Sequence, residues 1–314
     1  MQRKRLQNKI AESRWLLAFV VPPMFALWAF MAYFDHSILL PTFCLLFSNY
    51  LMMELNNANA LIRIYSRMVS ATFLILSSIA IFQFSSLALS IVTLCCIGYY
   101  TCLFRCYQDP NSQGWVFYAF LCVGLSSIVW VQALYFVPFL WIFLRTNLLA
   151  FNFKSWVSSL LGLLVPYVFY TAYLVYRQSF DRLIAHFTRL GEFSGLADYT
   201  CLSVAQLLYF SFIFLCAFIG TTHFLRQQRN DSIRTRLFYG VFMTINTLAI
   251  IFLILQPQHF IPLIGVITVS TSPLIAHFFA LTHTRGTNIV FKIITLSALA
   301  LLAYNLWIFL TNFF

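Results

Sequence analysis

The sequence predicts an all-α fold, a polytopic bundle of about eleven transmembrane helices, from three observations. Hydrophobic residues make up 61% of the 314 residues and charged residues only 9%, whereas roughly a quarter of a soluble domain is charged. The apolar residues form runs of about 17 to 22 without a charge, the length that a helix needs to cross a hydrocarbon layer of about 30 Å. The basic residues concentrate in alternate breaks between these runs, as expected of cytoplasmic loops.

The apolar runs define eleven spans in chain order. They are residues 15–34, 38–53, 68–84, 87–104, 115–131, 133–144, 156–176, 205–225, 237–255, 260–281 and 293–313. A strand barrel is disfavoured, because membrane strands alternate polar and apolar residues, whereas 156–176 and 293–313 are mostly apolar on every face. The runs 38–53 and 133–144 are the shortest, with 16 and 12 residues, and could be re-entrant, tilted or extended by their flanks.

The charge distribution predicts the orientation of the chain. If the amino terminus is cytoplasmic, inner segments hold 16 of the 19 basic residues. The other three, Arg177, Arg182 and Arg189, share one outer loop with three acids, so that loop is neutral. This division predicts an odd number of crossings, with both short runs spanning and the carboxyl terminus outside.

The spans leave little room for other domains. Residues 1–14 are predicted to be a basic cytoplasmic tail, and 15–314 a single transmembrane domain. Apolar residues at helical spacing in FDRLIAHFTRLGEF predict an amphipathic helix in the outer loop 177–204. The inner segment 54–67, ELNNANALIRIYSR, suits a short interfacial helix.

Several classes of function are disfavoured by composition. The basic residues form no patch for a nucleic acid. Most cysteines lie inside apolar runs, where they act as small apolar residues. The six histidines are scattered over different segments, so we expect no metal site, and no motif implies a cofactor. No charged residue lies near the middle of a span, which disfavours ion-coupled transport. Asn49, Asn246 and Asn305 are expected to bond between helices.

The outer loop holds the candidate binding residues. Arg182, His186 and Arg189 recur close to one face of the predicted helix. Such a cluster could bind the pyrophosphate of a lipid-linked sugar, and an interfacial helix that contacts phospholipid headgroups needs the same residues.

The segment 106–176, with its GLxS turn, Trp156 at a helix start and the motif GLLVPY, resembles an uncharacterised family of polytopic inner-membrane proteins of the Bacteroidetes group. The segment ELNNANALIRIYSRMVSATF is similar to the same family's inner loop and third helix. The resemblance implies location and architecture but no catalytic residue. Some members carry the label carotene monooxygenase, yet this sequence lacks the PHG-type motif and the intramembrane histidines of such enzymes.

The helix pair within 114–144 also resembles spans of membrane glycosyltransferases, although the sequence lacks their lysine after the turn and their acidic first loop. Enzymes of that class carry a catalytic acid in the first outer loop, which makes Asp35 the candidate catalytic residue. The short loop at Asp35 equally suits an acid that marks the end of a helix.

The sequence therefore predicts a multi-pass protein of the bacterial inner membrane. Its function is expected in the cell envelope, as an assembly partner or in lipid handling, and whether it is an enzyme stays open. Its partners would be the phospholipid bilayer and either other envelope membrane proteins or a lipid-linked substrate. The alternatives are a glycosyltransferase-like enzyme that uses a lipid-linked sugar, and a transporter of lipids or small molecules with a polar path through Asn49, Asn246 or Asn305.

Overall fold

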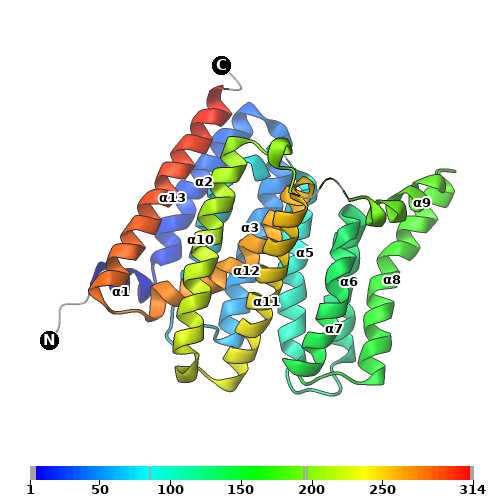
Figure 1. The fold of residues 1–314 in the computed structure, drawn as a ribbon, viewed down its shortest axis with the longest axis horizontal. Helices are drawn as coiled ribbons and strands as arrows, with labels where there is room; N and C mark the ends of the chain where they lie inside the picture. Colours follow the sequence, from blue (N-terminus) through cyan, green and yellow to red (C-terminus); the bar gives the residue numbers. More distant parts are fainter. Residues whose placement is uncertain (1–4, 85, 194, 196, 312–314) are drawn as a thin grey trace.

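In the computed structural model, which describes all residues except 1–4, 85, 194, 196 and 312–314, the chain is a bundle of helices, and the described residues form no strand (Figure 1). Each of the eleven predicted runs contains one main helix. These are α2 (Leu16–Phe34), α3 (Leu39–Asn59), α4 (Met68–Ile79), α5 (Leu87–Leu103), α6 (Gln113–Val129), α7 (Val137–Thr146), α8 (Phe153–Tyr176), α10 (Val204–Gln227), α11 (Ile233–Leu255), α12 (Phe260–Leu281) and α13 (Arg285–Thr311). The described residues form two further, short α-helices, α1 (Leu6–Ala11) and α9 (Asp181–Thr188), and several 3-10 turns.

Among the described residues, eight helical segments are long and apolar enough to cross a membrane. They are α2, α3, α5 together with the 3-10 turn Phe104–Cys106 that continues it, α8, α10, α11, α12 and α13. The run 38–53 is one of them, because α3 extends to 21 residues. The helices α4, α6 and α7 are shorter apolar helices. The run 133–144 divides into a six-residue 3-10 turn, Val131–Phe136, and the ten-residue α7.

The outer helices expose large apolar side chains, as a surface in contact with lipid does. Phe19 on α2, Phe169 on α8 and Trp307 on α13 are 76%, 73% and 68% exposed. A water-soluble protein rarely exposes extensive apolar patches. This surface fits a membrane protein.

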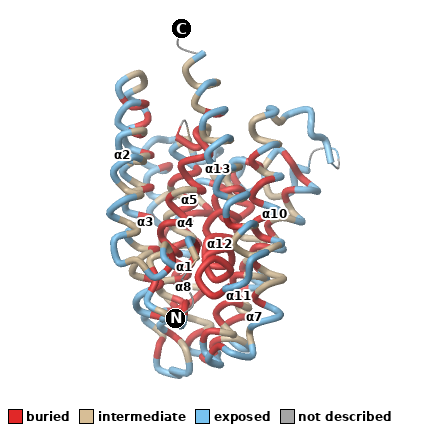
Figure 2. The backbone as a smooth tube through the Cα atoms, turned by 90° about the vertical axis from the view of Figure 1, so that its left-hand side faces the viewer, coloured by how far each residue is buried: buried red, intermediate tan, exposed pale blue. Residues whose placement is uncertain are grey.

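The helix α12 forms the centre of the bundle. Every residue from Leu263 to Leu281 is buried, and Figure 2 shows α12 as a buried element inside more exposed helices. It packs against α4, α5, α10 and α11. A helix that is apolar on all sides is expected to be buried in this way. Its few hydroxyl groups are bonded inside the bundle, as in the pair Tyr100 OH and Ser270 Oγ, 2.9 Å apart.

Small residues allow α6 and α8 to pack closely. A Cβ atom added to Gly162 would lie 2.5 Å from the Phe117 carbonyl oxygen, and one added to Gly124 would lie 2.9 Å from the Leu163 carbonyl oxygen. Glycine and serine at a helix interface are typical of membrane proteins, because backbones can then approach closely. The contact therefore depends on the absence of side chains at both positions.

The two ends of the bundle gather different loops. Segments predicted to be cytoplasmic are joined by hydrogen bonds from Ser66 Oγ to the Ala11 carbonyl (2.7 Å), from Arg63 Nη1 to the Asn230 carbonyl (3.4 Å) and from Asn147 Nδ2 to the Leu237 carbonyl (2.9 Å). Segments predicted to be outside are joined by bonds from Gln132 Nε2 to the Arg189 carbonyl (3.1 Å) and from the Ala197 amide to the Leu255 carbonyl (3.2 Å). In Figure 1, α1 lies beside the lower ends of α2 and α13, and α9 lies at the upper end of α8.

The prediction of a short interfacial helix at 54–67 is wrong. The first residues of this segment extend α3, which ends where Ala60 adopts a left-handed conformation with φ of 46°. The following residues are irregular, and Leu61 and Ile62 are buried in the bundle instead of facing lipid. Asn56 donates a hydrogen bond to the Ser66 carbonyl (3.0 Å), which holds the irregular segment against α3.

The helix in the run 68–84 is shorter than predicted, for a tertiary reason. Helix α4 ends at Ile79, and a 3-10 turn, Ile81–Gln83, follows. Asn305 on α13 donates a hydrogen bond of 2.7 Å from Nδ2 to the Ile79 carbonyl. Because the last carbonyls of a helix lack intrahelical partners, this bond stabilises the early end.

The amino-terminal segment, predicted to be a tail, is docked against the bundle over its described part. Helix α1 packs against α12 and α13. Gln7 donates to the Phe279 carbonyl (2.9 Å) and to Thr282 Oγ1 (2.6 Å), and Asn8 donates to the Thr282 carbonyl (3.0 Å). Both side chains are buried.

Candidate functional site

A polar pocket of about 220 Å³ lies between α9 and the upper end of the bundle. Its polar side chains come from α9, from the turn that follows α9 and from the 3-10 turns next to α7 and α12. They are Gln132, His186, Arg189, Glu192, Gln258 and His259. The pocket thus combines a cation, an anion, two imidazoles and two amides.

The local sequence explains how α9 reaches this position. Gln178 adopts a left-handed conformation with φ of 51°, which turns the chain after α8. Asp181 in the first turn of α9 is favourable to the helix dipole. After α9, the carbonyls of Arg189 and Leu190 accept hydrogen bonds from the side chains of Gln132 and Tyr135. These bonds tie the end of the loop to the turn that precedes α7.

His186 is a buried polar side chain of the pocket, at 8% exposed. Its ring packs against Tyr167 and Tyr170, with centroids 6.0 and 5.9 Å away. Burial is the main cause that lowers the pKa of His186. A hydrogen bond to the Ser127 backbone raises this pKa and the nearby charge of Arg189 lowers it, and the net shift is downward. His186 is therefore neutral at pH 7. Its Nε2 atom is buried and has no hydrogen-bond partner.

The opposite wall of the pocket is built on Trp130. The indole Nε1 donates to His259 Nδ1 at 3.5 Å, and the ring stacks on Phe252 at a centroid distance of 6.1 Å. Gln258 Nε2 donates to the Glu192 carbonyl at 3.5 Å. Trp130 and His259 are thereby held in place beside the loop.

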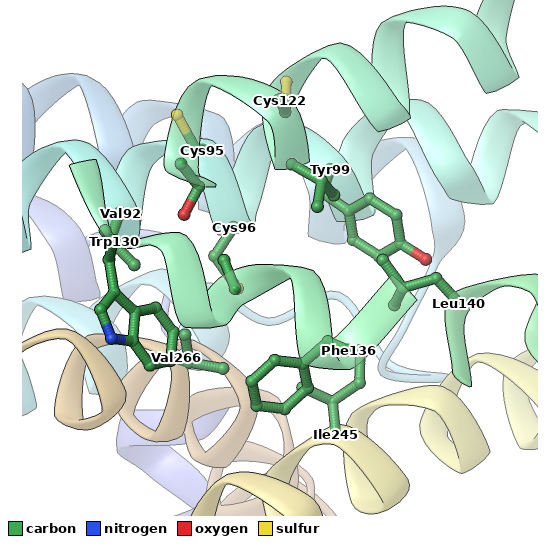
Figure 3. Close-up of a pocket in the computed structure, with 13 residues that line it drawn as sticks. Val92, Cys95, Cys96, Tyr99, Cys122, Trp130, Phe136, Leu140, Ile245 and Val266 are labelled. Atoms are coloured by element: carbon green, nitrogen blue, oxygen red, sulfur yellow. The ribbon is translucent and has the colours of Figure 1, made fainter. Parts of the chain in front are cut away.

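A second, apolar cavity lies behind Trp130 (Figure 3). It is only about 60 Å³ and is lined by residues such as Cys95, Cys96, Cys122 and Phe136. This is about the volume of two waters in the liquid, too small for a substrate. All three cysteines are free, in keeping with the packing role predicted for them. Any ligand of this region must therefore bind mainly in the polar pocket.

The structure brings together two of the three predicted binding residues. His186 and Arg189 line the polar pocket. Arg182 instead lines a separate open depression of about 480 Å³, together with Arg177. The sequence did not predict that Gln132, Gln258 and His259 lie in the same pocket as His186 and Arg189. The available signal was their position next to the outer ends of predicted spans.

Asp35 lies far from this pocket. Its Oδ1 atom accepts a hydrogen bond of 2.9 Å from the Ser37 amide and caps the short turn His36–Ile38 between α2 and α3. In Figure 1, α2 and α9 are at opposite sides of the bundle. Asp35 is also absent from the lining of the polar pocket. The geometry offers no support for Asp35 acting together with the loop cations.

A buried cluster of side chains lies at the other end of the bundle. His277 Nε2 is 3.1 Å from Asp231 Oδ2, and His277 Nδ1 is 3.4 Å from His223 Nδ1. His277 is fully buried. The sequence-based view of scattered histidines is therefore wrong for this pair. Among the described residues, however, no group of three or more histidine, cysteine, aspartate or glutamate side chains is placed to hold a metal ion.

The buried asparagines bond between or within helices. Asn305 bonds to α4, as above, and Asn246 Oδ1 accepts from Thr271 Oγ1 at 3.3 Å. None of the cavities described above is lined by Asn49, Asn246 or Asn305. The polar path that the transporter alternative predicts thus gains no support.

No protein-family model matches this chain, no curated protein matches its sequence, and no solved structure matches its fold. The family resemblance of residues 106–176 therefore stays a prediction. The function has to follow from the geometry of the site.

Proposed function

We propose that the chain is a multi-pass protein of the bacterial inner membrane, with a cytoplasmic amino terminus and eleven crossings. The 16-to-3 division of the basic residues supports this orientation. The hydrogen bonds at the two ends of the bundle support it as well, because each end joins segments that the charge pattern assigns to one side. In this arrangement the short helices α4, α6 and α7 also cross the membrane, packed between longer helices of the bundle.

Cys201 provides a direct test of this orientation, since it is the cysteine in the outer loop and is exposed. We expect a membrane-impermeant maleimide to label intact cells through Cys201 and the Cys201→Ser variant to lose the label. In the Cys201→Ser background, Arg229→Cys on the cytoplasmic side should react only after permeabilisation. Labelling of Cys201 only in permeabilised cells would contradict the proposed orientation.

Within the membrane we propose a role in lipid handling, in which the polar pocket binds the headgroup of a lipid from the outer leaflet. The observation that carries this proposal is the pocket itself, enclosed between the bundle and the amphipathic helix α9. The apolar side chains Phe180, Ile184 and Phe187 on and next to α9 are 49%, 56% and 41% exposed. A helix with such a face typically lies at the interface between headgroups and acyl chains, which supports a pocket at headgroup depth.

The charges of the pocket favour a zwitterionic headgroup with a primary ammonium, such as phosphoethanolamine. Arg189 and Glu192 give the edge of the pocket one positive and one negative charge. A guanidinium binds a phosphate through charge-assisted hydrogen bonds. The exposed Glu192 carboxylate accepts hydrogen bonds, as an ammonium group requires.

The lipids that stay bound to the extracted protein test this proposal. The protein would be extracted from nanodiscs that contain equal amounts of phosphatidylethanolamine and phosphatidylcholine with the same acyl chains, and native mass spectrometry would count the bound lipids. We expect preferential retention of phosphatidylethanolamine. Arg189→Ala and Glu192→Ala should each weaken it about tenfold, since each removes a charge-assisted hydrogen bond.

The matched control is Arg182→Ala, which removes the same charge from the neighbouring depression and should leave the preference unchanged. Equal retention of the two lipids by the unmodified protein, or an equal loss in the Arg182 and Arg189 variants, would exclude the pocket as a headgroup site.

A further inference from the structure

A long apolar cavity of about 260 Å³ lies on the opposite flank of the bundle from the polar pocket, beneath α2 and α13. Its floor is formed by α4, α10 and α12, and Ile10 of α1 contributes at one end. The two hydroxyl groups in its lining, those of Thr72 and Thr295, donate hydrogen bonds to backbone carbonyls. The cavity therefore offers a ligand only apolar contacts.

The length of the cavity corresponds to one leaflet of a bilayer. Its lining follows α4 from Met68 to Ile79, which is about 16 Å at 1.5 Å per residue. The hydrocarbon core of a bilayer is about 30 Å thick, so the cavity extends over half of it. Leu299 and Thr295 line the cavity and are also exposed on the bundle surface, so its side is open to surrounding lipid. Past the end of the cavity that is remote from α1, Leu306 of α13 packs against the apolar cluster around Trp28 of α2, so α2 and α13 are in contact there.

Basic residues surround the end of the cavity at α1. Lys9 and Arg14 are exposed; Lys9 precedes the lining residue Ile10, and Arg14 is two positions before the lining residue Leu16. Lys292 is exposed on α13, one turn before Thr295. Glu12 is the acid in this part of the chain, and with three cations against one carboxylate the rim stays positive. Such a rim attracts an anionic headgroup.

We propose that this cavity holds one acyl chain of an anionic phospholipid from the leaflet on the α1 side, with the lipid phosphate at Lys9, Arg14 and Lys292. A narrow apolar cavity of leaflet length fits a single unbranched chain. The positive rim selects the headgroup at the depth where that chain ends. The site is separate from the polar pocket and does not depend on it.

Competition between two lipids for binding to the protein tests this proposal. The full-length protein would be delipidated in mild detergent and offered equal amounts of phosphatidylglycerol and phosphatidylcholine with the same chains, and native mass spectrometry would count the retained lipids. We expect one tightly retained phosphatidylglycerol. Ala298→Phe fills the cavity and should abolish this retention, while Ala300→Phe, on the exposed side of the same helix, should leave it intact.

Variants of the basic residues test the contacts with the lipid headgroup separately from those with the acyl chain. Each of Lys9→Ala, Arg14→Ala and Lys292→Ala should reduce the preference for phosphatidylglycerol about fivefold, the effect expected of one basic residue near an anionic lipid. Arg145→Ala and Lys154→Ala remove exposed charges from the last turn of α7 and the first turn of α8 and should leave the preference unchanged. Because Ala298→Phe could disturb folding, Ala298→Leu would be measured beside it, with thermal unfolding of both as a folding control.

Two results would overturn the proposal. One is retention of phosphatidylglycerol by a folded Ala298→Phe or Ala298→Leu protein at the unmodified level. The other is equal retention of the two lipids by the unmodified protein. The Arg189→Ala variant of the polar pocket should retain phosphatidylglycerol normally, so failure of one site is distinguishable from failure of the other.

Discussion

Replacing Gly162 by leucine is expected to force α8 away from α6 and to lower the free energy of unfolding by about 3 kcal/mol, the upper part of the range for overpacking a close contact. The reason is the 2.5 Å distance between an added Cβ and the Phe117 carbonyl oxygen, which belongs to rigid helix backbone. Titration with sodium dodecyl sulfate in bicelles measures the change.

Gly114 provides the matched control, because a Cβ added there meets nothing within 4 Å. It lies in the first turn of α6. Gly114→Ala should unfold like the unmodified protein or slightly later, since alanine favours a helix by about 1 kcal/mol over glycine. If Gly162→Leu were as stable as Gly114→Ala, the close approach of α6 and α8 would be refuted.

Replacing His277 by alanine is the second change with a large expected effect, a loss of about 3 kcal/mol in unfolding free energy. The substitution removes the hydrogen-bond partner of the Asp231 carboxylate, of which Oδ2 lies 3.1 Å from His277 Nε2. Both side chains are buried, so the substitution would leave a buried carboxyl group without this hydrogen-bond partner. The same bicelle titration measures the loss.

Asp231→Asn keeps a hydrogen-bonding group beside His277 and should cost less than His277→Ala. His36→Ala, which removes an exposed histidine from the turn after α2, should have little effect. Equal stability of the His277→Ala and His36→Ala proteins would show that the buried pair does not hold α12 to the loop between α10 and α11.

Much of the fold could be predicted because the determining signals are local. The run 260–281 has the same bounds as α12, and α9 lies inside the loop expected to be amphipathic. The length and period of apolar residues depend only on neighbours in the chain. The position of each helix within the bundle, central or peripheral, could not be inferred in this way. Nothing in the composition of the runs distinguishes α12 at the centre from α13 at the surface, because both are apolar around most of their circumference.

The candidate sites were predictable only in part, for the same reason. His186 and Arg189 share a short segment, so their proximity followed from helical spacing. His277 and Asp231 are 46 positions apart, and His277 and His223 are 54 apart. Their contact depends on which helices are neighbours. The end of α4 likewise depends on Asn305, which lies 226 positions from Ile79.

The sequence by itself determined that this chain is helical, where its apolar helices lie and which loops share a charge pattern, because lipid requires each crossing segment to satisfy its own backbone hydrogen bonds. Only the tertiary structure decided which side chains meet: the polar pocket at α9, the buried pair of His277 and Asp231, and the leaflet-length cavity beneath α2 and α13. Between apolar helices the partner is chosen by close packing and a few polar contacts, and these depend on positions far apart in the chain.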